Sequence, residues 1–412
     1  MPQRVAPLCP PEVPLDRDIR WVLLAAFASG LAKQEQPASA ERASQLIRRL
    51  GLVQQVASRR SVEELTSVLG EPSAKALLRV AAQSSMRSLA VTQSRNAVLK
   101  ATSRAQIDIA LLKGAALEVL GVIEPGERYY TDVDVLVELA EREKLTAILL
   151  DEGFAVEHRK AHANDVVVVR SAKTDIGVEL HTRIQGIRLA TGLSPDMSAL
   201  RAAGLLVPRG VGMLAQSPKG SASPNDSVGL LLPTLPILGA QLVVQGWYLF
   251  HFVPNAPRHK TPVRLLVDLS LLRVHEDVDL ADAIFGYVEH LVPEEEFRGL
   301  VALAHALTRG HLQQLERNAQ CVLFHIIAAS IDERYRSSLM LERQQYAVSG
   351  EGLGGWTRRQ LSRLILPSPT EVRSLIAQGS ARNPIEARAR IAWRLVDRGI
   401  RGSWASIVRR KS

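Results

Sequence analysis

The stretch TDVDVLVE, residues 131–138, constrains the fold of this chain more than any other part of its sequence. Apolar residues alternate with Asp132 and Asp134, and this two-residue period predicts a β-strand with both carboxylates on one face. The intervening valines would point to the opposite face, into a core. Burying a carboxylate costs several kcal/mol unless a positive charge meets it, so the strand predicts a cation close to the two aspartates.

Two carboxylates on one strand face, about 7 Å apart, repel each other unless a cation lies between them. Mg²⁺ prefers hard oxygen ligands and commonly binds a few carboxylates together with substrate phosphates. Asp132 and Asp134 therefore predict a metal site. The equally open alternative is a solvated strand end without a special function.

Two neighbouring segments favour the metal site. Upstream, an apolar run ends in Lys113 and Gly114, and a helical pattern follows at once, so the predicted turn offers a lysine charge and free N–H groups to an anion. Downstream, Glu179 interrupts the strand pattern IGVELH and could face the same cleft as the aspartates. The alternatives are a strand-to-helix turn with a surface lysine and an exposed glutamate on an edge strand.

Hydrophobic periodicity divides the whole chain into five expected regions. They are an N-terminal helical domain (1–105), an α/β core (106–190), a hairpin and flexible linker (191–234), a helical domain (235–345) and a basic helical tail (346–412). Strands rich in Val, Ile and Leu are expected within 107–114, 130–138, 165–170 and 174–181, and a hairpin or turn within 156–165. The expected fold class is α+β, a small mixed sheet flanked by helical domains.

Charge and cysteine content restrict the partners and the compartment. Residues 351–412 contain 13 basic and 4 acidic residues and so carry the whole net charge of +9. The basic tail predicts either a solvated helical face packed on the protein or an arm that recruits nucleic acid. Cys9 and Cys321 form no CxxC pattern, and the longest apolar runs are broken by Pro and Gly. We therefore expect a cytoplasmic protein without a membrane partner.

The residues around the aspartate strand resemble a bacterial family of uncharacterised nucleotidyltransferases within the superfamily of DNA polymerase beta. That family shows a Leu-Lys-Gly turn, an Arg four residues before an Asp-x-Asp-x-Leu-Val strand, a helix ending in Gly-aromatic, and an acid followed by Leu-His. The matching positions in this chain are Lys113-Gly114, Arg128, Asp132, Asp134, Leu136, Val137, Gly153-Phe154 and Glu179-Leu180-His181. Arg264 and Asp268, in the later helical region, fit the family's layout more loosely.

The resemblance implies an enzyme that uses Mg²⁺ or Mn²⁺ to transfer a nucleoside monophosphate from a nucleoside triphosphate, expected to be ATP, to a hydroxyl acceptor. The implied catalytic metal ligands are Asp132, Asp134 and Glu179, and the implied nucleotide-binding residues are Lys113, Gly114, Ala115 and Arg128. His181 would orient the neighbouring acid from outside the ligand set. The acceptor is left open between a small molecule, a peptide or protein, and a nucleic acid reached through the basic tail.

Two departures from the family pattern leave a second function open. Ala115 stands where the superfamily often has a serine for phosphate, and Glu179 stands where the family more often has aspartate. Both departures are compatible with a catalytically degenerate binding or regulatory protein that keeps the same fold. Nucleotide turnover in the presence of Mg²⁺ would distinguish the enzyme from the binding protein.

Overall fold

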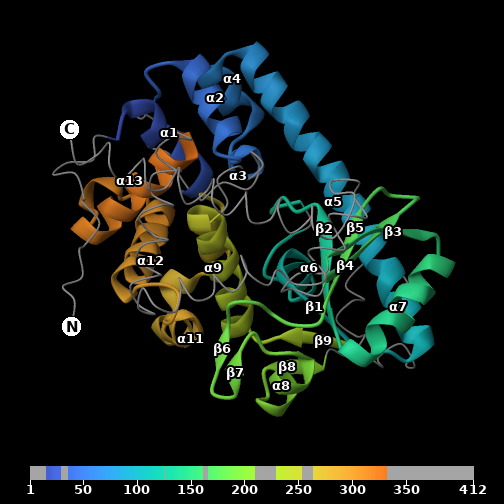
Figure 1. Ribbon diagram of the computed structural model, residues 1–412. Helices are drawn as coiled ribbons and strands as arrows, with labels where there is room; N and C mark the ends of the chain where they lie inside the picture. The colour runs from blue at the N-terminus through green and yellow to red at the C-terminus, as the bar shows by residue number, and fades with distance from the viewer. Residues whose placement is uncertain are drawn as a thin grey trace, which may run out of the picture.

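The computed structural model describes residues 15–28, 36–124, 126–160, 166–208, 229–252 and 263–331 (Figure 1). The predicted basic tail at 346–412 lies outside the described residues, as do residues 209–228 of the predicted hairpin and linker. The expectations for these two segments therefore stay predictions.

The N-terminal region is helical, as predicted. It contains α1 (Arg17–Phe27), α2 (Ala40–Arg49), α3 (Val53–Arg59), α4 (Val62–Leu69) and α5 (Glu71–Ala105). The side chain of Ser61 accepts a hydrogen bond from the Glu64 backbone, and the Glu64 side chain accepts one from the Ser61 backbone, which fixes the start of α4. α5 runs from the N-terminal helices down to the sheet and so connects the two parts of the molecule (Figure 1).

A seven-stranded mixed sheet forms the centre of the fold. Its strands are β1 (Ile109–Leu111), β2 (Asp132–Val137), β3 (Phe154–Lys160), β4 (Val166–Ser171), β5 (Gly177–His181), β8 (Leu206–Pro208) and β9 (Leu230–Pro233). Their order across the sheet is β3-β4-β5-β2-β1-β9-β8. β2 is central, parallel to β5 and antiparallel to β1, while β6 (Arg188–Leu189) and β7 (Gly192–Leu193) form a separate hairpin. This arrangement confirms the expected α+β class.

Each of the four predicted strand segments contains an observed strand, but the sheet is larger than expected. β3 occupies part of the segment predicted as a hairpin or turn, because its charged residues hide the apolar period that identifies inner strands. Such residues are typical of edge strands, and β3 is the edge. At the other edge, β8 and β9 lie within the stretch 191–234 that was expected to hold a hairpin and linker.

Helices cover both faces of the sheet. α6 (Lys113–Val119) contacts β2 and α9 (Leu235–Phe252), whereas α5 contacts β2 and α7 (Leu139–Asp151). Val133, Val135 and Leu136 of β2 are fully buried, so neither face of this strand is open to solvent at its centre. A strand buried on both faces reads as a nearly continuous apolar run, which explains the sequence VLV after the second aspartate.

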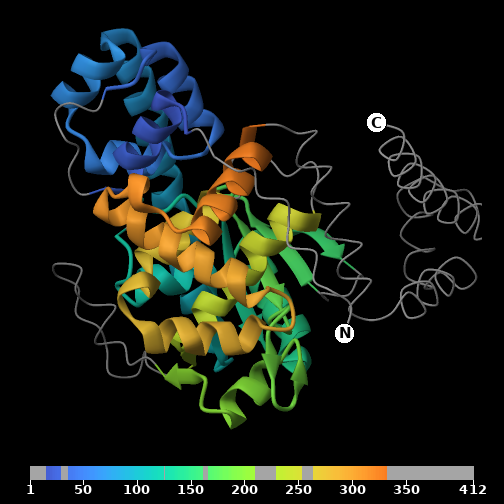
Figure 2. The same cartoon turned by 90° about the vertical axis from the view of Figure 1, so that its left-hand side faces the viewer.

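The remaining helices pack beside the sheet and below the N-terminal helices (Figure 2). They are α8 (Met197–Ala202), α10 (Val263–Leu271), α11 (Val278–Val288), α12 (Glu294–Arg309) and α13 (Arg317–Ile331), with the short 3₁₀ helices η3 (Val274–Glu276) and η4 (Leu312–Gln314). α1 contacts α12, so the N-terminal and C-terminal helical regions touch each other. Among the helices that the structure describes, none is both long enough and apolar enough to cross a membrane.

Candidate active site

The pairing of β2 with β5 brings the acidic residues together. In the parallel register, Asp134 lies opposite Glu179 and Leu136 lies opposite His181. Residues opposite each other on paired strands point to the same face, and residues two apart on a strand share that face. Asp132, Asp134, Glu179 and His181 therefore share one face of the sheet, which is the arrangement expected from the sequence for the three acids.

Asp134 is the centre of this group. Its Oδ1 accepts a hydrogen bond from Lys113 Nζ at 2.5 Å and lies 2.9 Å from His181 Nε2. The same imidazole nitrogen lies 3.4 Å from Glu179 Oε2. The side chain of Asp134 is only 5% exposed, whereas that of Glu179 is 24% exposed. The positive partner that a buried carboxylate requires is therefore Lys113, assisted by His181.

The opposite charges of these neighbouring side chains stabilise one another's ionised forms. Burial raises the pKa of Asp134, but Lys113 and His181 outweigh it and leave that pKa well below its usual range. The hydrogen bond from His181 lowers the pKa of Glu179, against burial and against the charge of Asp134. Burial lowers the pKa of Lys113, yet the carboxylates of Asp134, Asp132 and Glu179 together raise it above its ordinary value. Both Asp134 and Glu179 are thus carboxylates at neutral pH.

Lys113 reaches Asp134 because of the turn that joins β1 to α6. Lys113 is the first residue of α6 and has a φ of 49°, in the left-handed region that costs a residue with a side chain about 1–3 kcal/mol. Its backbone N–H donates to Gln241 Oε1 of α9 at 3.4 Å. The ion pair with Asp134 and this hydrogen bond offset the cost of the strained backbone. In this conformation the ammonium group of Lys113 lies over the acidic face.

Gly114 is required by packing at this turn. A Cβ atom on Gly114 would lie 2.8 Å from Arg128 Nη1 and 2.8 Å from Tyr130 Cγ, closer than carbon atoms approach in proteins. The absence of a side chain thus lets α6 sit against Arg128 and Tyr130. The following residue, Ala115, is also buried, at 1% exposure. The nucleotide-binding roles suggested for Gly114 and Ala115 stay predictions.

Arg128 binds a carboxylate far along the chain. Its Nε lies 2.5 Å from Asp268 Oδ1 and its Nη2 lies 3.0 Å from Asp268 Oδ2, a bidentate pair with both side chains at most 5% exposed. The pair ties the segment before β2 to α10. From the sequence, Arg128 was expected to bind the nucleotide, and Asp268 was noted only through the family's layout. The aspartate in the apolar helical run VRLLVDLSLL was the available signal.

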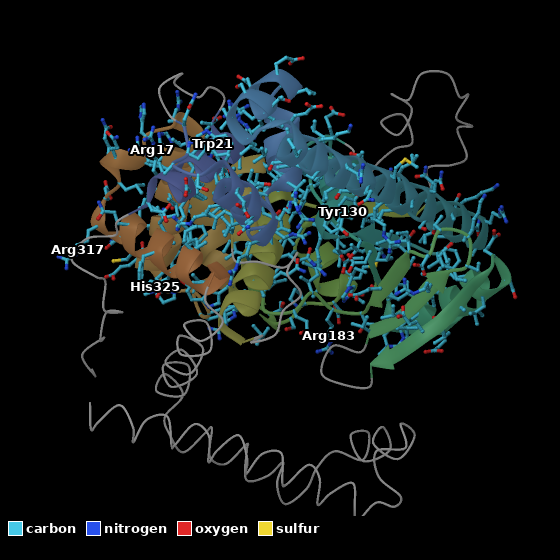
Figure 3. The ribbon with its side chains drawn as sticks, turned by 90° about the horizontal axis from the view of Figure 1, so that it is seen from above. Arg17, Trp21, Tyr130, Arg183, Arg317 and His325 are labelled. Carbon is cyan, nitrogen blue, oxygen red and sulfur yellow. The ribbon has the colours of Figure 1, made fainter. Side chains whose placement is uncertain are left out.

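A second buried pair, which sequence reasoning missed, positions Tyr130. Arg95 Nη1 of α5 lies 2.7 Å from Glu118 Oε2 of α6, and the Tyr130 hydroxyl donates to the same carboxylate oxygen. Tyr130 is 4% exposed and lies beside α5 in the middle of the molecule (Figure 3). Burial and then Glu118 raise the pKa of Tyr130, so its hydroxyl is protonated and remains a donor. This contact fixes the ring that lies against Gly114.

Asp134, Glu179 and His181 could hold a divalent metal ion. One ligand atom from each of these residues lies within 4.8 Å of the others. Two carboxylate oxygens suit Mg²⁺ or Mn²⁺, and an imidazole nitrogen is acceptable to Mn²⁺. His181 thus belongs to the group itself, although the sequence suggested only an orienting role for it. Asp132 lies two residues along the same strand, outside this group of three, and its role as a metal ligand stays a prediction.

His181 makes the stability of the fold depend on pH. Burial lowers the pKa of His181, but its hydrogen bonds to Asp134 and Glu179 raise the pKa above the ordinary value of 6.5. The imidazolium therefore stabilises the folded state fully below about pH 6.5, and this contribution is lost as the pH rises through the folded pKa. We expect His181→Gln to be less stable than the unmodified protein by a margin that shrinks as the pH rises above about 6.5. Urea unfolding of both proteins with EDTA measures this margin, and a margin that stays constant would contradict the assignment.

The fold and the site together define a class of protein. A central strand carries acidic residues, a neighbouring strand adds another acid, and a lysine from a strand-to-helix turn meets them, which is the arrangement expected of a nucleotidyltransferase core. Residues 36–203 match the family model described as uncharacterised nucleotidyltransferase. The resemblance found in the sequence is thereby confirmed. The match includes Lys113, Asp134 and His181 and ends before α9 and α10. No curated protein and no solved structure matches the chain.

Proposed function

We propose that this protein is an Mg²⁺-dependent nucleotidyltransferase, which transfers a nucleoside monophosphate from a triphosphate, expected to be ATP, to the hydroxyl group of an acceptor. The match to the nucleotidyltransferase family model supports the class of reaction. The observation that carries the proposal is the meeting of Asp134 and Glu179 on adjacent strands with the ammonium group of Lys113 at the same carboxylate.

The proposed roles follow from charge and position. Asp134 and Glu179 would hold the divalent metal, with Asp132 as a third carboxylate. When bound, the metal supplies positive charge at the α-phosphate and at the leaving pyrophosphate. Lys113 can exchange its carboxylate partner for a phosphate oxygen, since both are anionic acceptors of its hydrogen bonds. In the reaction, the acceptor oxygen forms a bond to the α-phosphorus and the bond to pyrophosphate breaks.

The lowered pKa values of Asp134 and Glu179 bear on the catalytic strategy. Neither carboxylate is a strong base, so rate enhancement would come mainly from positioning and from charge stabilisation. Glu179 is the more exposed of the two and is the better placed to meet an incoming acceptor hydroxyl. The proton of that hydroxyl would pass to Glu179 or through it to water.

A second candidate is a binding or regulatory protein that keeps the fold and no longer catalyses transfer. The observation that favours it is the direct Lys113–Asp134 ion pair, which satisfies the buried carboxylate without a metal. The enzyme would turn over nucleotide, whereas the binding protein would only bind it. Incubating the protein with each α-labelled nucleoside triphosphate, Mg²⁺ and a cell lysate should move label onto an acceptor if the protein is an enzyme. Nucleotide binding without label transfer, under every nucleotide, would favour the binding protein.

Glu179→Gln tests the third acid within that assay. The variant keeps the size of the side chain but loses the charge, so we expect label transfer to fall by about a hundredfold or more. Glu157→Gln is the matched control, because Glu157 is a carboxylate on β3 whose partner is the exposed side chain of Arg170. The control should transfer label at the normal rate. Full activity of Glu179→Gln would remove Glu179 from the site.

A further inference from the structure

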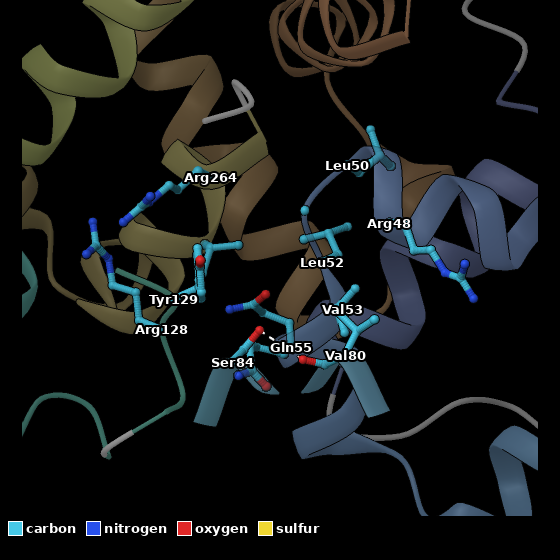
Figure 4. A pocket seen from close by; sticks show the side chains of 13 residues that line it. Arg48, Leu50, Leu52, Val53, Gln55, Val80, Ser84, Arg128, Tyr129 and Arg264 are labelled. Carbon is cyan, nitrogen blue, oxygen red and sulfur yellow. Dashed lines mark hydrogen bonds between the residues drawn. The ribbon is translucent and has the colours of Figure 1, made fainter. Parts of the chain in front are cut away.

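A cavity lies between the N-terminal helices and α10, and Arg128, which precedes β2, is part of its lining. Its volume is about 310 Å³, within the range of pockets that hold small molecules. Leu50, Leu52 and Val80 contribute an apolar wall, and Arg128 and Arg264 contribute two guanidinium groups (Figure 4). The family match ends at residue 203, so α10 and Arg264 lie outside the matched region.

The two arginines differ in their pairing. Arg128 uses both oxygens of Asp268, as described above. Within the part of the chain that the structure describes, no hydrogen bond or ion pair joins Arg264 to another residue. Burial and then the charge of Arg128 lower the pKa of Arg264 to about 10, against the carboxylates of Asp268, Asp132 and Asp134, which raise it. Among the described residues, therefore, nothing serves as a bonded counterion to the charge of Arg264.

A guanidinium group in such a position needs an anion. Arg264 is partly buried, and partly removing an arginine from water without a hydrogen-bonded partner destabilises the folded state. A bound phosphate or carboxylate would satisfy the guanidinium through charge-assisted hydrogen bonds. The residues that line the cavity show how an anion bound there would lie relative to the Lys113 turn. Arg128 lines the cavity and also packs against the turn that carries Lys113, since its Nη1 lies 2.8 Å from where a Cβ of Gly114 would be.

We propose that this cavity binds the acceptor substrate, and that the acceptor is a small organic anion. Its phosphate or carboxylate group would pair with Arg264, and its uncharged body would lie against Leu50, Leu52 and Val80. The volume of the cavity suits a small molecule and not a folded protein or a nucleic acid strand. The assignment rests on the proposed function, because a hydroxyl of the bound molecule would be the group that receives the nucleotide.

Binding of simple probes by the full-length protein tests the proposal. Phenyl phosphate and benzoate carry the two candidate anionic groups on one apolar body, and phenol is the uncharged comparison. Calorimetric titration should show binding of at least one anion and much weaker binding of phenol, and the preferred anion identifies the acceptor group. Arg264→Met should weaken that binding by about tenfold to a hundredfold. Arg79→Met, which removes an exposed arginine of α5, should leave it unchanged.

The stability of Arg264→Met provides the second readout. Because the substitution removes a charge without a bonded counterion, the melting temperature in anion-free buffer should stay the same or rise. A clear fall in melting temperature would make Arg264 a structural residue and would overturn the proposal. Equal binding of the anion by Arg264→Met and the unmodified protein, or no binding of either anion, would also overturn it.

Nucleotide binding separates this proposal from the proposed function. Arg264→Met should bind a non-hydrolysable ATP analogue with Mg²⁺ as tightly as the unmodified protein. Loss of nucleotide binding in Arg264→Met would assign the cavity to the nucleotide and overturn the acceptor assignment, while the nucleotidyltransferase proposal stands. Anion binding at Arg264 in a protein that binds no nucleotide would contradict the nucleotidyltransferase proposal and leave an anion site that serves another purpose.

Discussion

Asp134→Asn is expected to reduce nucleotidyl transfer by about a hundredfold to a thousandfold or more. The substitution keeps the shape of the side chain but removes the charge that faces Lys113, His181 and the proposed metal. Steady-state label transfer measures the effect, with the circular dichroism spectrum as a check of folding. Activity within a few-fold of the unmodified protein would place the reaction elsewhere in the chain.

Asp134→Asn is also expected to change the stability of the fold. The strand pattern alone and the contacts in the structure predict opposite directions for this change. From the strand alone, removing one of two neighbouring carboxylates should relieve repulsion and stabilise the protein. In the structure, however, Asp134 binds two cationic side chains, and losing a hydrogen bond to a charged group costs about 1.5–3 kcal/mol. We therefore expect Asp134→Asn to be less stable in metal-free buffer, as urea unfolding would show. A more stable variant would mean that repulsion from Asp132 and Glu179 dominates.

Asp268→Asn is expected to destabilise the fold by about 3–5 kcal/mol, the largest effect on stability that we predict. Both members of the Arg128–Asp268 pair are buried, so the variant leaves Arg128 without its bonded counterion and removes a carboxylate that raises the pKa of Arg264. Urea unfolding at neutral pH measures the change. A loss below about 1 kcal/mol, the range of surface ion pairs, would contradict the buried pair.

Two further variants separate pairing from packing. Glu152→Gln breaks the Arg104–Glu152 pair, which has the same 2.5 Å separation but is exposed, and should cost less than about 1 kcal/mol. Combining Arg128→Met with Asp268→Leu removes both charges of the buried pair. This double variant should recover much of the stability that Asp268→Asn loses, because no charge of the pair is then left buried alone.

The central part of the fold could be predicted because its signals are local. The alternation around Asp132 and Asp134 identified β2 and the face that its acids share, and Lys113 and Gly114 marked the turn into α6. The register between β2 and β5 depends on strands about forty residues apart, yet the shared face of Glu179 followed from the same two-residue period. The family resemblance, confirmed for residues 36–203, rested on these same residues.

Contacts between distant segments could not be predicted from local patterns. Arg128 and Asp268 are 140 residues apart, and no local pattern in either segment indicates that the two side chains pair. Lys113 was expected to meet phosphate, and the sequence did not show that it would first pair with Asp134. The edge strand β3 lacks the apolar period because consecutive residues 155–157 are all exposed, so neither face of this part of the strand is buried.

Binding of Mn²⁺ measured by electron paramagnetic resonance tests the central claim most directly. The titration uses the full-length protein with and without ATP in which a methylene group replaces the α,β-bridging oxygen, so that binding is separated from turnover. We predict that the unmodified protein binds Mn²⁺ saturably, that the nucleotide analogue strengthens this binding, and that Asp134→Asn removes it. Equal Mn²⁺ binding by the unmodified protein and Asp134→Asn, with or without nucleotide, would contradict a metal–nucleotide site on β2 and β5.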